Sequence, residues 1–204
     1  MRSIFLFASF VIVSAQYAFA QLPQTNIFLT NVTFNLGNMT VTKPVNISGK
    51  NSYSDDPAFS PDGKVILYTS YSDSLGHTEI YKYQLKTKTS ALFTSSADSK
   101  RMPAMMPDGK NVSFIVSEQP AHHRLWKMPL TGGTPEIILK DKDSIGSYCW
   151  MSPDSVALQV LSNPASLQAA SISTGAAKTV ATNVRACIKR MPAQGPVPGK
   201  WENC

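Results

Sequence analysis

Pro57-Ala58-Phe59-Ser60-Pro61-Asp62-Gly63-Lys64 decides the fold, because this stretch returns twice at a constant interval. The second copy is Pro103-Ala104-Met105-Met106-Pro107-Asp108-Gly109-Lys110, and a weaker third copy is Tyr148-Cys149-Trp150-Met151-Ser152-Pro153-Asp154-Ser155. Asp62, Asp108 and Asp154 therefore follow one another every 46 residues. A fixed period of this length indicates a repeat architecture in which each copy builds the same structural unit.

The centre of each copy predicts a hairpin turn. Proline presets φ at the first turn position, aspartate bonds to the nearby backbone, and glycine accepts a positive φ. We expect structural turns at Pro61, Asp62, Gly63, Pro107, Asp108, Gly109, Pro153 and Asp154. Repetition within a turn favours this role for Asp62 and Asp108 over acid/base chemistry. Ser155 replaces the third glycine and should add about 1 kcal/mol of strain if the left-handed geometry is kept.

The residues after each turn predict four short strands per repeat. Runs rich in β-branched and aromatic residues come first, at 65–69, 112–116 and 156–160. After a polar loop, the segments 80–85, 125–130 and 167–172 follow, in which alternate residues share one face. Further turns at 87–89, 131–133 and 174–176 lead to a fourth strand, such as 91–94 or 136–139.

This pattern predicts an all-β fold, a β-propeller built from four-stranded antiparallel blades. Sandwiches and solenoids also contain many strands, but a fixed period of roughly 40–50 residues is typical of propeller blades. We expect blades at about 53–94, 99–139 and 145–182, preceded by a half-blade at 26–47 with strands at 27–32 and 41–47. About three and a half blades make an incomplete ring, because propellers need four or more blades to close.

The motif Pro57-x-Phe59-Ser60-Pro61-Asp62-Gly63-Lys64, together with Ile80-Tyr81, resembles the TolB-like β-propellers with the WD40-like PD40 repeat. The resemblance covers about residues 26–184. It implies the propeller fold. It is compatible with several roles, because such propellers occur as stand-alone periplasmic binding proteins, as partner-binding domains, and fused to peptidases and other enzymes.

Both ends of the chain differ from the repeats. Arg2, the apolar run 4–13 and Ala18-Phe19-Ala20 predict a signal peptide at 1–20, so we expect a periplasmic or secreted protein. A retained anchor or a lipoprotein is the alternative, and we expect no membrane span after cleavage. The tail at 185–204 is basic, irregular and rich in proline and glycine. We interpret it as the scar of a truncated or frame-shifted longer gene, with a ring-completing dimer as the alternative.

Charge and motif content exclude several functions. The formal net charge is +6, but Arg2 leaves with the signal and four more cations lie in the tail, so no basic patch for nucleic acid remains. Cys149, Cys187 and Cys204 are too few for a disulfide framework, and no Cys/His spacing predicts a metal site. The chain lacks nucleophile-elbow, zinc-protease and nucleotide-binding motifs, so we predict no catalytic residue, no cofactor and no enzymatic activity.

The loops opposite the Pro-Asp-Gly turns form the candidate binding face. Their polar residues can contact a partner or ligand, although most exposed polar side chains are simply solvated. The candidates are Asp55, Asp56, Tyr71, Asp73, His77, Asp98, Lys100, Arg101, His122 and His123, with Glu118, Asp141 and Asp143 in the same loops. We expect a non-catalytic propeller that binds a protein partner or small ligand, with self-association through open blade edges as a further expectation. The alternative is an accessory propeller of an exported hydrolase or peptidase.

Overall fold

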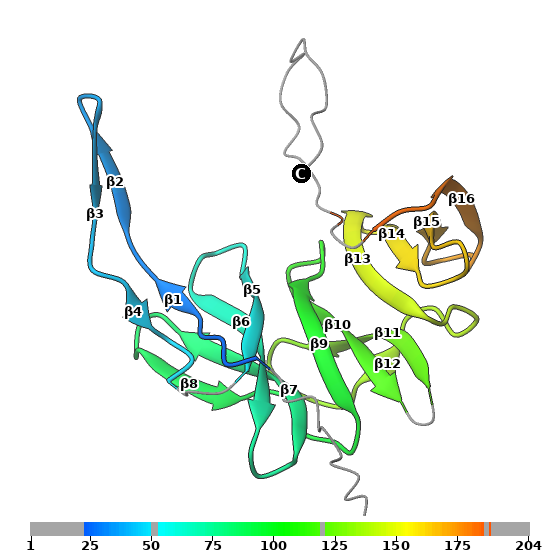
Figure 1. Ribbon diagram of the computed structural model, residues 1–204, viewed down its shortest axis with the longest axis horizontal. Coiled ribbons are helices and arrows are strands. Elements are labelled where there is room, and N and C mark those ends of the chain that lie inside the picture. The colour runs from blue at the N-terminus through cyan, green and yellow to red at the C-terminus, as the bar shows by residue number, and fades with distance from the viewer. Residues whose placement is uncertain (1–22, 50–52, 119–120, 186–187, 189–204) are drawn as a thin grey trace, which may run out of the picture.

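The computed structural model describes residues 23–49, 53–118, 121–185 and 188. These residues form sixteen β-strands and no helix (Figure 1). A search of the described residues finds no helix long and apolar enough to cross a membrane. The predicted signal peptide at 1–20 and most of the predicted tail at 185–204 lie outside the described residues.

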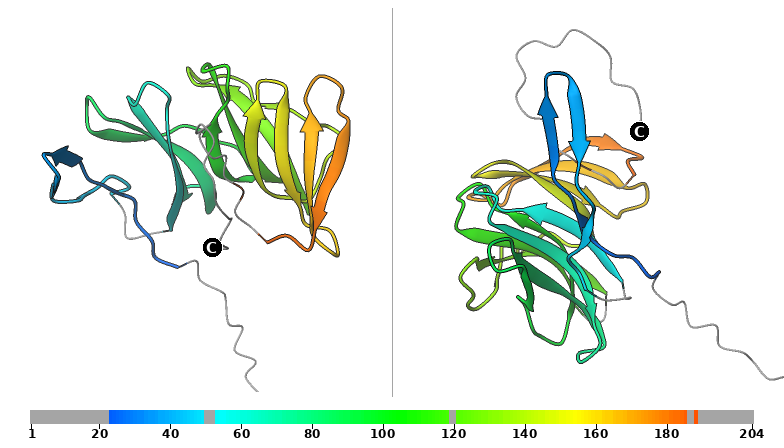
Figure 2. Two further views of the ribbon diagram at one scale, coloured as in Figure 1. Left: turned by 90° about the horizontal axis from the view of Figure 1, so that it is seen from above. Right: turned by 90° about the vertical axis from the view of Figure 1, so that its left-hand side faces the viewer.

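Three four-stranded antiparallel sheets follow one another along the chain, each ordered as its strands occur in the sequence. Blade 1 comprises β5 (Ser54–Phe59), β6 (Val65–Ser72), β7 (His77–Gln84) and β8 (Thr89–Leu92). Blade 2 comprises β9 (Ser99–Met105), β10 (Asn111–Glu118), β11 (His122–Pro129) and β12 (Glu136–Ile137). Blade 3 comprises β13 (Ile145–Ser152), β14 (Ser155–Val160), β15 (Ser166–Ser171) and β16 (Ala177–Thr182). The blades form an arc with β5, β9 and β13 on its concave side, which confirms the predicted propeller class (Figures 1 and 2).

The hydrophobic core lies between neighbouring blades, because the second strand of a blade buries both of its faces. In β6, Ile66 and Tyr68 face the N-terminal strands, whereas Leu67 packs toward blade 2. In β10, Phe114 packs toward blade 1, and Ile115 packs toward blade 3. This double burial explains the nearly continuous apolar runs that the sequence shows after each turn.

The N-terminal strands form a half-blade, which the sequence predicts, and a hairpin, which sequence reasoning missed. The half-blade pairs β1 (Phe28–Leu29) with β4 (Val45–Asn46) and packs Ile27 and Ile47 on blade 1. Between them, β2 (Val32–Asn35) and β3 (Asn38–Val41) form a hairpin that projects away from the blades (Figures 1 and 2). The expected strands 27–32 and 41–47 are thus each divided. Pro44 explains one break, because proline cannot donate to a sheet ladder.

The three Pro-Asp-Gly-type turns are not equivalent. Gly63 and Gly109 have φ values of 65° and 66°. In these turns the aspartate bonds to the backbone that follows it, as when Lys64 N donates to Asp62 Oδ1 over 3.1 Å. Ser155 does not have a positive φ, so the expected strain does not arise; β13 and β14 instead pair up to Ser152 and Ser155 across a two-residue turn.

Asp154 has a different role from the aspartates of the first two turns. Its carboxylate accepts hydrogen bonds from the hydroxyls of Ser171 and Ser173 over 3.0 Å each, and from Ser173 N over 2.8 Å. Asp154 therefore links its own turn to the β15–β16 turn of the same blade.

Candidate functional site

Because the strands alternate in direction, one end of the blades contains the connections β6–β7, β8–β9, β10–β11, β12–β13 and β14–β15. We call this end the loop face, and the opposite end the turn face. Of the ten predicted binding residues, Asp73 and Asp98 lie in loops, whereas the other eight belong to the ends of strands. The strands extend past their apolar runs because backbone pairing continues through polar residues, as in the pair Ser72 and His77.

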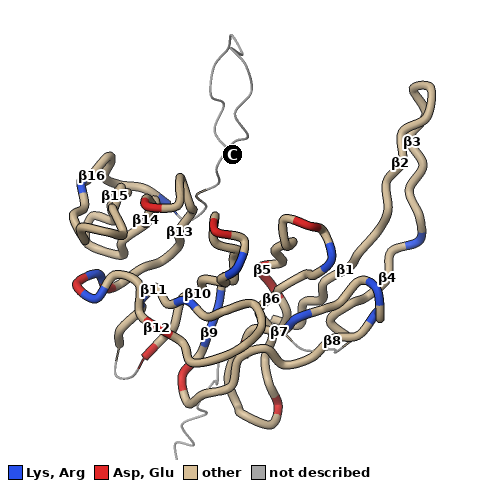
Figure 3. Tube along the Cα trace, turned by 180° about the vertical axis from the view of Figure 1, so that it is seen from behind, with Lys and Arg blue, Asp and Glu red and all other residues tan. Residues whose placement is uncertain are grey.

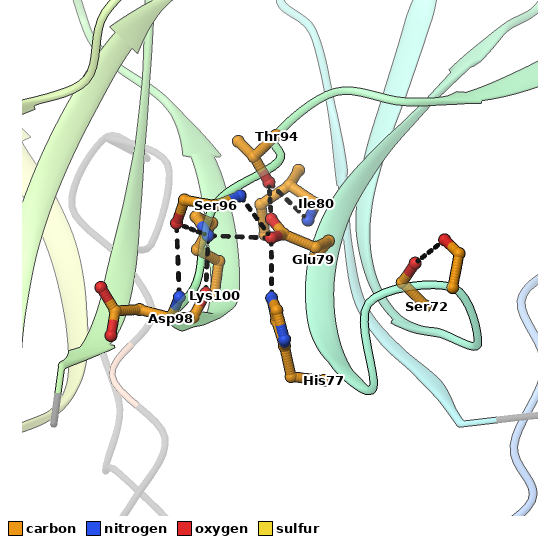
Figure 4. Close-up of polar contacts among 9 residues, drawn as sticks. Ser72, His77, Glu79, Ile80, Thr94, Ser96, Asp98 and Lys100 are labelled. Atoms are coloured by element: carbon orange, nitrogen blue, oxygen red, sulfur yellow. Dashed lines mark hydrogen bonds and ion pairs between the residues drawn. The ribbon is translucent and has the colours of Figure 1, made fainter.

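A buried charge cluster joins blade 1 to blade 2 near the loop face (Figure 4). Glu79 is 0 % exposed and Lys100 is 2 % exposed, and Lys100 Nζ lies 2.9 Å from Glu79 Oε1. The same ammonium group donates to Ser96 Oγ over 2.5 Å and to the Asp98 carbonyl over 2.6 Å. Its three protons are all used, which lets the interior hold the charge.

Glu79 is equally saturated. Its Oε1 also accepts from Ser96 N and lies within hydrogen-bond distance of His77 Nε2, each over 3.0 Å, and its Oε2 accepts from the Thr94 hydroxyl. Sequence reasoning missed Glu79, because the need for an anion beside Lys100 follows only once the structure shows that this lysine is buried. The predicted residues His77 and Lys100 thus meet around this carboxylate, and Lys100 does not reach solvent.

A second group lies on the inner strands and crosses all three blades. Asp56 Oδ2 in β5 accepts from the hydroxyl of Thr69 and from the main-chain N–H of Met102 in β9, each over 3.2 Å. Arg101 in β9 donates to the carbonyls of Gly146 and Ile145 over 2.9 and 3.2 Å. Both Asp56 and Met102 have a positive φ, of 53° and 55°, so the same backbone kink recurs one repeat later.

Burial governs the electrostatics of this inner group. It raises the pKa of Asp56, and the neighbouring charge of Asp55 raises that pKa further, while hydrogen bonds from Thr69 and Met102 oppose the change. Burial likewise lowers the pKa of Arg101, which the charge of Asp56 partly offsets. Asp55 itself is exposed, and its carboxylate accepts from the Tyr53 hydroxyl over 3.4 Å.

A third group surrounds Asp143 on blade 2. Asp143 Oδ1 accepts from the main-chain N–H groups of His123 and Ser144 over 2.9 and 2.5 Å, and Oδ2 contacts Nδ1 of His122. Partial burial alone would raise the pKa of Asp143, but the hydrogen bonds from His122, Ser144 and His123 prevail and lower it to about 2. Beside this group, Glu118 binds Arg124 and accepts from Trp126 Nε1 over 2.8 Å.

This third group contains a serine–histidine pair without the arrangement of a catalytic triad. His123 Nδ1 lies 2.9 Å from Ser117 Oγ. A triad needs a carboxylate on the other nitrogen of the same imidazole, to orient that ring as a base. Asp143 instead holds the main chain of His123 and the ring of His122. Among the described residues, no group of three or more His, Cys, Asp or Glu side chains is placed to hold a metal ion.

The ten predicted residues therefore do not form one site. His77 and Lys100, with the main chain of Asp98, belong to the Glu79 cluster; Asp55, Asp56 and Arg101 belong to the inner group; His122 and His123 surround Asp143. Tyr71 is half-buried at the end of β6, where its main-chain N–H donates to the Tyr53 carbonyl over 2.9 Å. Asp55, Asp73 and His122 are the exposed members.

Comparison with known proteins identifies the fold. The sequence matches no protein-family model, and no curated protein matches it. The structure is similar to TolB from Acinetobacter baumannii, with a TM-score of 0.60 and 18 % identity over 76 % of this chain and 41 % of that one. A protein described as TolB from Agrobacterium tumefaciens has a TM-score of 0.54 and 18 % identity over 76 % of this chain and 60 % of that one.

Other propeller-containing proteins are also similar. A puromycin-hydrolyzing peptidase from Mycobacterium tuberculosis has a TM-score of 0.52 and 13 % identity over 71 % of this chain and 23 % of that one. The chain thus spans 41 % and 60 % of the lengths of the two TolB structures. Identities this low define the architecture alone, which is a TolB-like β-propeller.

Proposed function

We propose that this chain, a β-propeller with TolB-like blades, is an exported and non-catalytic protein that binds a protein partner or ligand through its loop face. One observation supports the proposal above all others. The buried charges near the loop face are occupied in joining blades, as in the Glu79–Lys100 pair, whereas Asp55, Asp73 and His122 are exposed there. Polar residues presented by loops and strand ends on a rigid scaffold are typical of a recognition surface.

The proposal of a non-catalytic role rests on the hydrogen bonding of the titratable groups. Asp56 is held by Thr69 and Met102, and Asp143 is held by two main-chain N–H groups and His122. A general acid or base has to reach substrate, and a nucleophile needs an oriented base. The Ser117–His123 pair has no carboxylate on its imidazole among the described residues, which favours binding over catalysis.

The proposal of export rests on the N-terminal sequence. The cationic, apolar and small-residue segments of residues 1–20 have the order of a secretory signal. Expression of the complete gene followed by N-terminal sequencing of the mature protein tests this part. We expect the mature chain to begin near Gln21, and an intact Met1 in the exported fraction would contradict cleavage.

The role of an accessory propeller in a hydrolase is a second candidate, because the fold is also similar to part of the puromycin-hydrolyzing peptidase. Translating the DNA beyond codon 204 separates the two roles. Further propeller repeats would favour the stand-alone binder. A Gly-x-Ser-x-Gly segment followed by a histidine would favour the accessory domain.

Quantitative affinity capture tests binding through the loop face. The bait proteins are the wild type, a loop-face variant with Asp73→Arg and Asp141→Arg, and a turn-face control with Lys86→Glu and Lys110→Glu. All four positions are exposed, so we expect each variant to keep a melting temperature close to that of the wild type. We expect at least one captured protein to be lost from the loop-face variant alone. Equal capture by all three baits, or loss from the control alone, would contradict the proposal.

A further inference from the structure

The projecting hairpin of β2 and β3 has one apolar face and one polar face. Directly paired residues lie on the same face of a two-stranded sheet, and successive residues alternate between the faces. The apolar face therefore contains the pairs Val32–Val41 and Phe34–Met39, and the polar face contains Thr33, Asn35, Asn38 and Thr40. All residues of both strands are exposed, and Phe34 is exposed to 76 %.

Two more apolar side chains extend the apolar face toward the tip and the base. Leu36 lies in the turn of the hairpin and is 97 % exposed. At the base, Ile27 and Leu29 pack toward blade 1, so the exposed Phe28 between them points away from blade 1. We call the six apolar residues together the hairpin face: Phe28, Val32, Phe34, Leu36, Met39 and Val41. An isolated two-stranded hairpin is at best marginally stable in water, which favours a partner that covers this face.

The free edges of the hairpin favour a protein over a lipid surface as that partner. Among the described strands, β2 and β3 pair only with each other, so each strand has one edge without a neighbouring strand. Open sheet edges do not enter the hydrocarbon region of a bilayer, because no water is present there to bond their N–H and C=O groups. The polar face, with Thr33 and Asn35, would also have to leave water.

The absence of charge favours a second copy of this chain. Residues 23–42 contain no aspartate, glutamate, lysine, arginine or histidine, and Figure 3 shows no lysine, arginine or acidic residue on β2 and β3. Such a face cannot select a charged partner, but it can pack against itself without repulsion. Lys43 is the first charged residue after the hairpin and lies at its base, between β3 and β4. Two hairpins in antiparallel orientation keep these lysines at opposite ends.

The sizes of the side chains also fit an antiparallel contact. The bulky Phe34 and Met39 form the middle of the face, and Leu36 forms its tip. The smaller Val32 and Val41 lie nearer the base. When the two tips point in opposite directions, Leu36 of one copy lies over the valines of the other, and the two middle pairs meet. Because the hairpin projects away from the blades, the two sets of blades then lie at opposite ends of the contact (Figure 2).

The hairpin face is large enough for a specific dimer. Covering its six side chains on both copies buries on the order of 1,200 Å² in total, the lower end of the range for specific interfaces. We propose that a second copy of this chain covers the hairpin face, in a two-fold symmetric dimer whose hairpins pack face to face and antiparallel. The contact contains no residue of the loop face and no blade edge, so it does not depend on the partner proposed for the loop face.

Sedimentation velocity of the purified mature protein, from low to high micromolar concentration, tests the dimer. We expect a reversible equilibrium between monomer and dimer. Phe34→Thr keeps a residue that favours strands and should weaken the dimer at least about tenfold, because it truncates a side chain at the centre of the contact. The matched control Phe59→Thr changes a phenylalanine of β5 that is 56 % exposed, and it should leave the dimer unchanged. Because the hairpin is exposed, Phe34→Thr should keep the wild-type melting temperature in circular dichroism.

Two charged substitutions test the antiparallel arrangement. Leu36→Lys and Val41→Glu should each weaken the dimer about tenfold or more, because each places a charge against an apolar face. An equimolar mixture of the two variants should form a dimer again. In that mixed dimer the new ammonium group lies beside the new carboxylate, and the other contact keeps its original Leu36 and Val41.

Three results would overturn the proposal. The first is a monomer at every concentration, and the second is an equal loss of the dimer in Phe34→Thr and Phe59→Thr, which would show general hydrophobic association. The third is a monomer that binds neutral phospholipid vesicles and loses this binding in Phe34→Thr, which would assign the hairpin face to a membrane. A mixture of Leu36→Lys and Val41→Glu that stays monomeric would contradict the antiparallel arrangement.

Discussion

The hydroxyl of Tyr148 donates a hydrogen bond to the main-chain carbonyl of Met102, which lies 2.9 Å away and 46 residues earlier in the chain. The main-chain N–H of Met102 in turn donates to Asp56 Oδ2 over 3.2 Å, again 46 residues earlier. One position of the repeat is thus bonded to its own counterparts on β5, β9 and β13. The period seen in the sequence is the spacing of the contacts that join the blades.

Replacing Tyr148 by phenylalanine tests the contact between blades 2 and 3. Tyr148 is 6 % exposed, and its hydroxyl also bonds to Ser113 Oγ over 3.0 Å. Burial raises the pKa of Tyr148, so the hydroxyl stays protonated at the neutral pH of an unfolding experiment. We expect Tyr148→Phe to lower the free energy of unfolding by about 1–2 kcal/mol in urea titrations, with an unchanged m-value. The half-buried Tyr71→Phe is the control, and an equal loss in both variants would contradict the assignment.

The buried ion pair predicts strong coupling between Glu79 and Lys100. Glu79→Gln leaves the Lys100 charge without its anion in the interior, which should cost about 3 kcal/mol or more. Lys100→Met should cost a similar amount because it leaves the Glu79 carboxylate uncompensated. The double variant Glu79→Gln/Lys100→Met removes both charges, and we expect it to be more stable than the sum of the two losses implies. Strict additivity in urea unfolding would show that the pair does not act as one unit.

Asp143 predicts a pH-dependent part of the stability. Its pKa is about 2 in the folded protein, below the usual 3.8, so the folded state binds fewer protons than the unfolded state between these values. The contribution is complete above about pH 5, decreases below about pH 4 and is lost near pH 2. Because the side chain is 39 % exposed, screening should limit the contribution to about 1 kcal/mol.

Urea unfolding of Asp143→Asn at several pH values measures that contribution. We expect the stability difference from the wild type to be largest at pH 6 and to shrink as the pH falls toward 2.5. Asp141→Asn, at an exposed neighbouring position, is the control. A difference independent of pH would mean that the charge of Asp143 is not what stabilises the loop.

The turns predict that removing a glycine from the first turn and adding a glycine to the third turn both destabilise the protein. Gly63 has a φ of 65°, and a Cβ added there meets nothing within 4 Å, so Gly63→Ala isolates the backbone strain at about 1 kcal/mol. Ser155 lacks a positive φ, and its hydroxyl lies 2.6 Å from Ser152 Oγ. We therefore expect Ser155→Gly to destabilise the protein, because it removes this contact and loosens the unfolded chain. A stabilising Ser155→Gly would show that the third turn is strained after all.

Local patterns made the blades predictable from the sequence. The Pro-Asp-Gly turns and the apolar runs act over a few residues, so β6, β10 and β14 could be placed before any contact was known. The projecting hairpin was missed, although Asn35-Leu36-Gly37-Asn38 lies between the alternating pairs Val32/Phe34 and Met39/Val41. Alternating apolar residues predict a strand whether or not another layer covers its apolar face. The pattern therefore did not show that these strands leave the half-blade.

The arrangement of the candidate site depended on contacts that no local pattern contains. Lys100 and His77 were both candidates, but their meeting at Glu79 requires the packing of β7 on β9. Arg101 was expected in a loop, and its bonds to Ile145 and Gly146 require the neighbouring blade. Burial of a charged side chain is set by such long-range packing, so the sequence could name these residues but not distinguish those that join blades from those that face solvent.

Photo-crosslinking in cells tests the central claim, binding through the loop face, most directly. A photoreactive amino acid is placed in turn at Asp73 and His122 on the loop face, and at Lys86 and Lys110 on the turn face, all of them exposed. We predict that both loop-face positions crosslink to the same partner and that neither turn-face position does. Crosslinks from the turn face alone, or an identical pattern from all four positions, would contradict it.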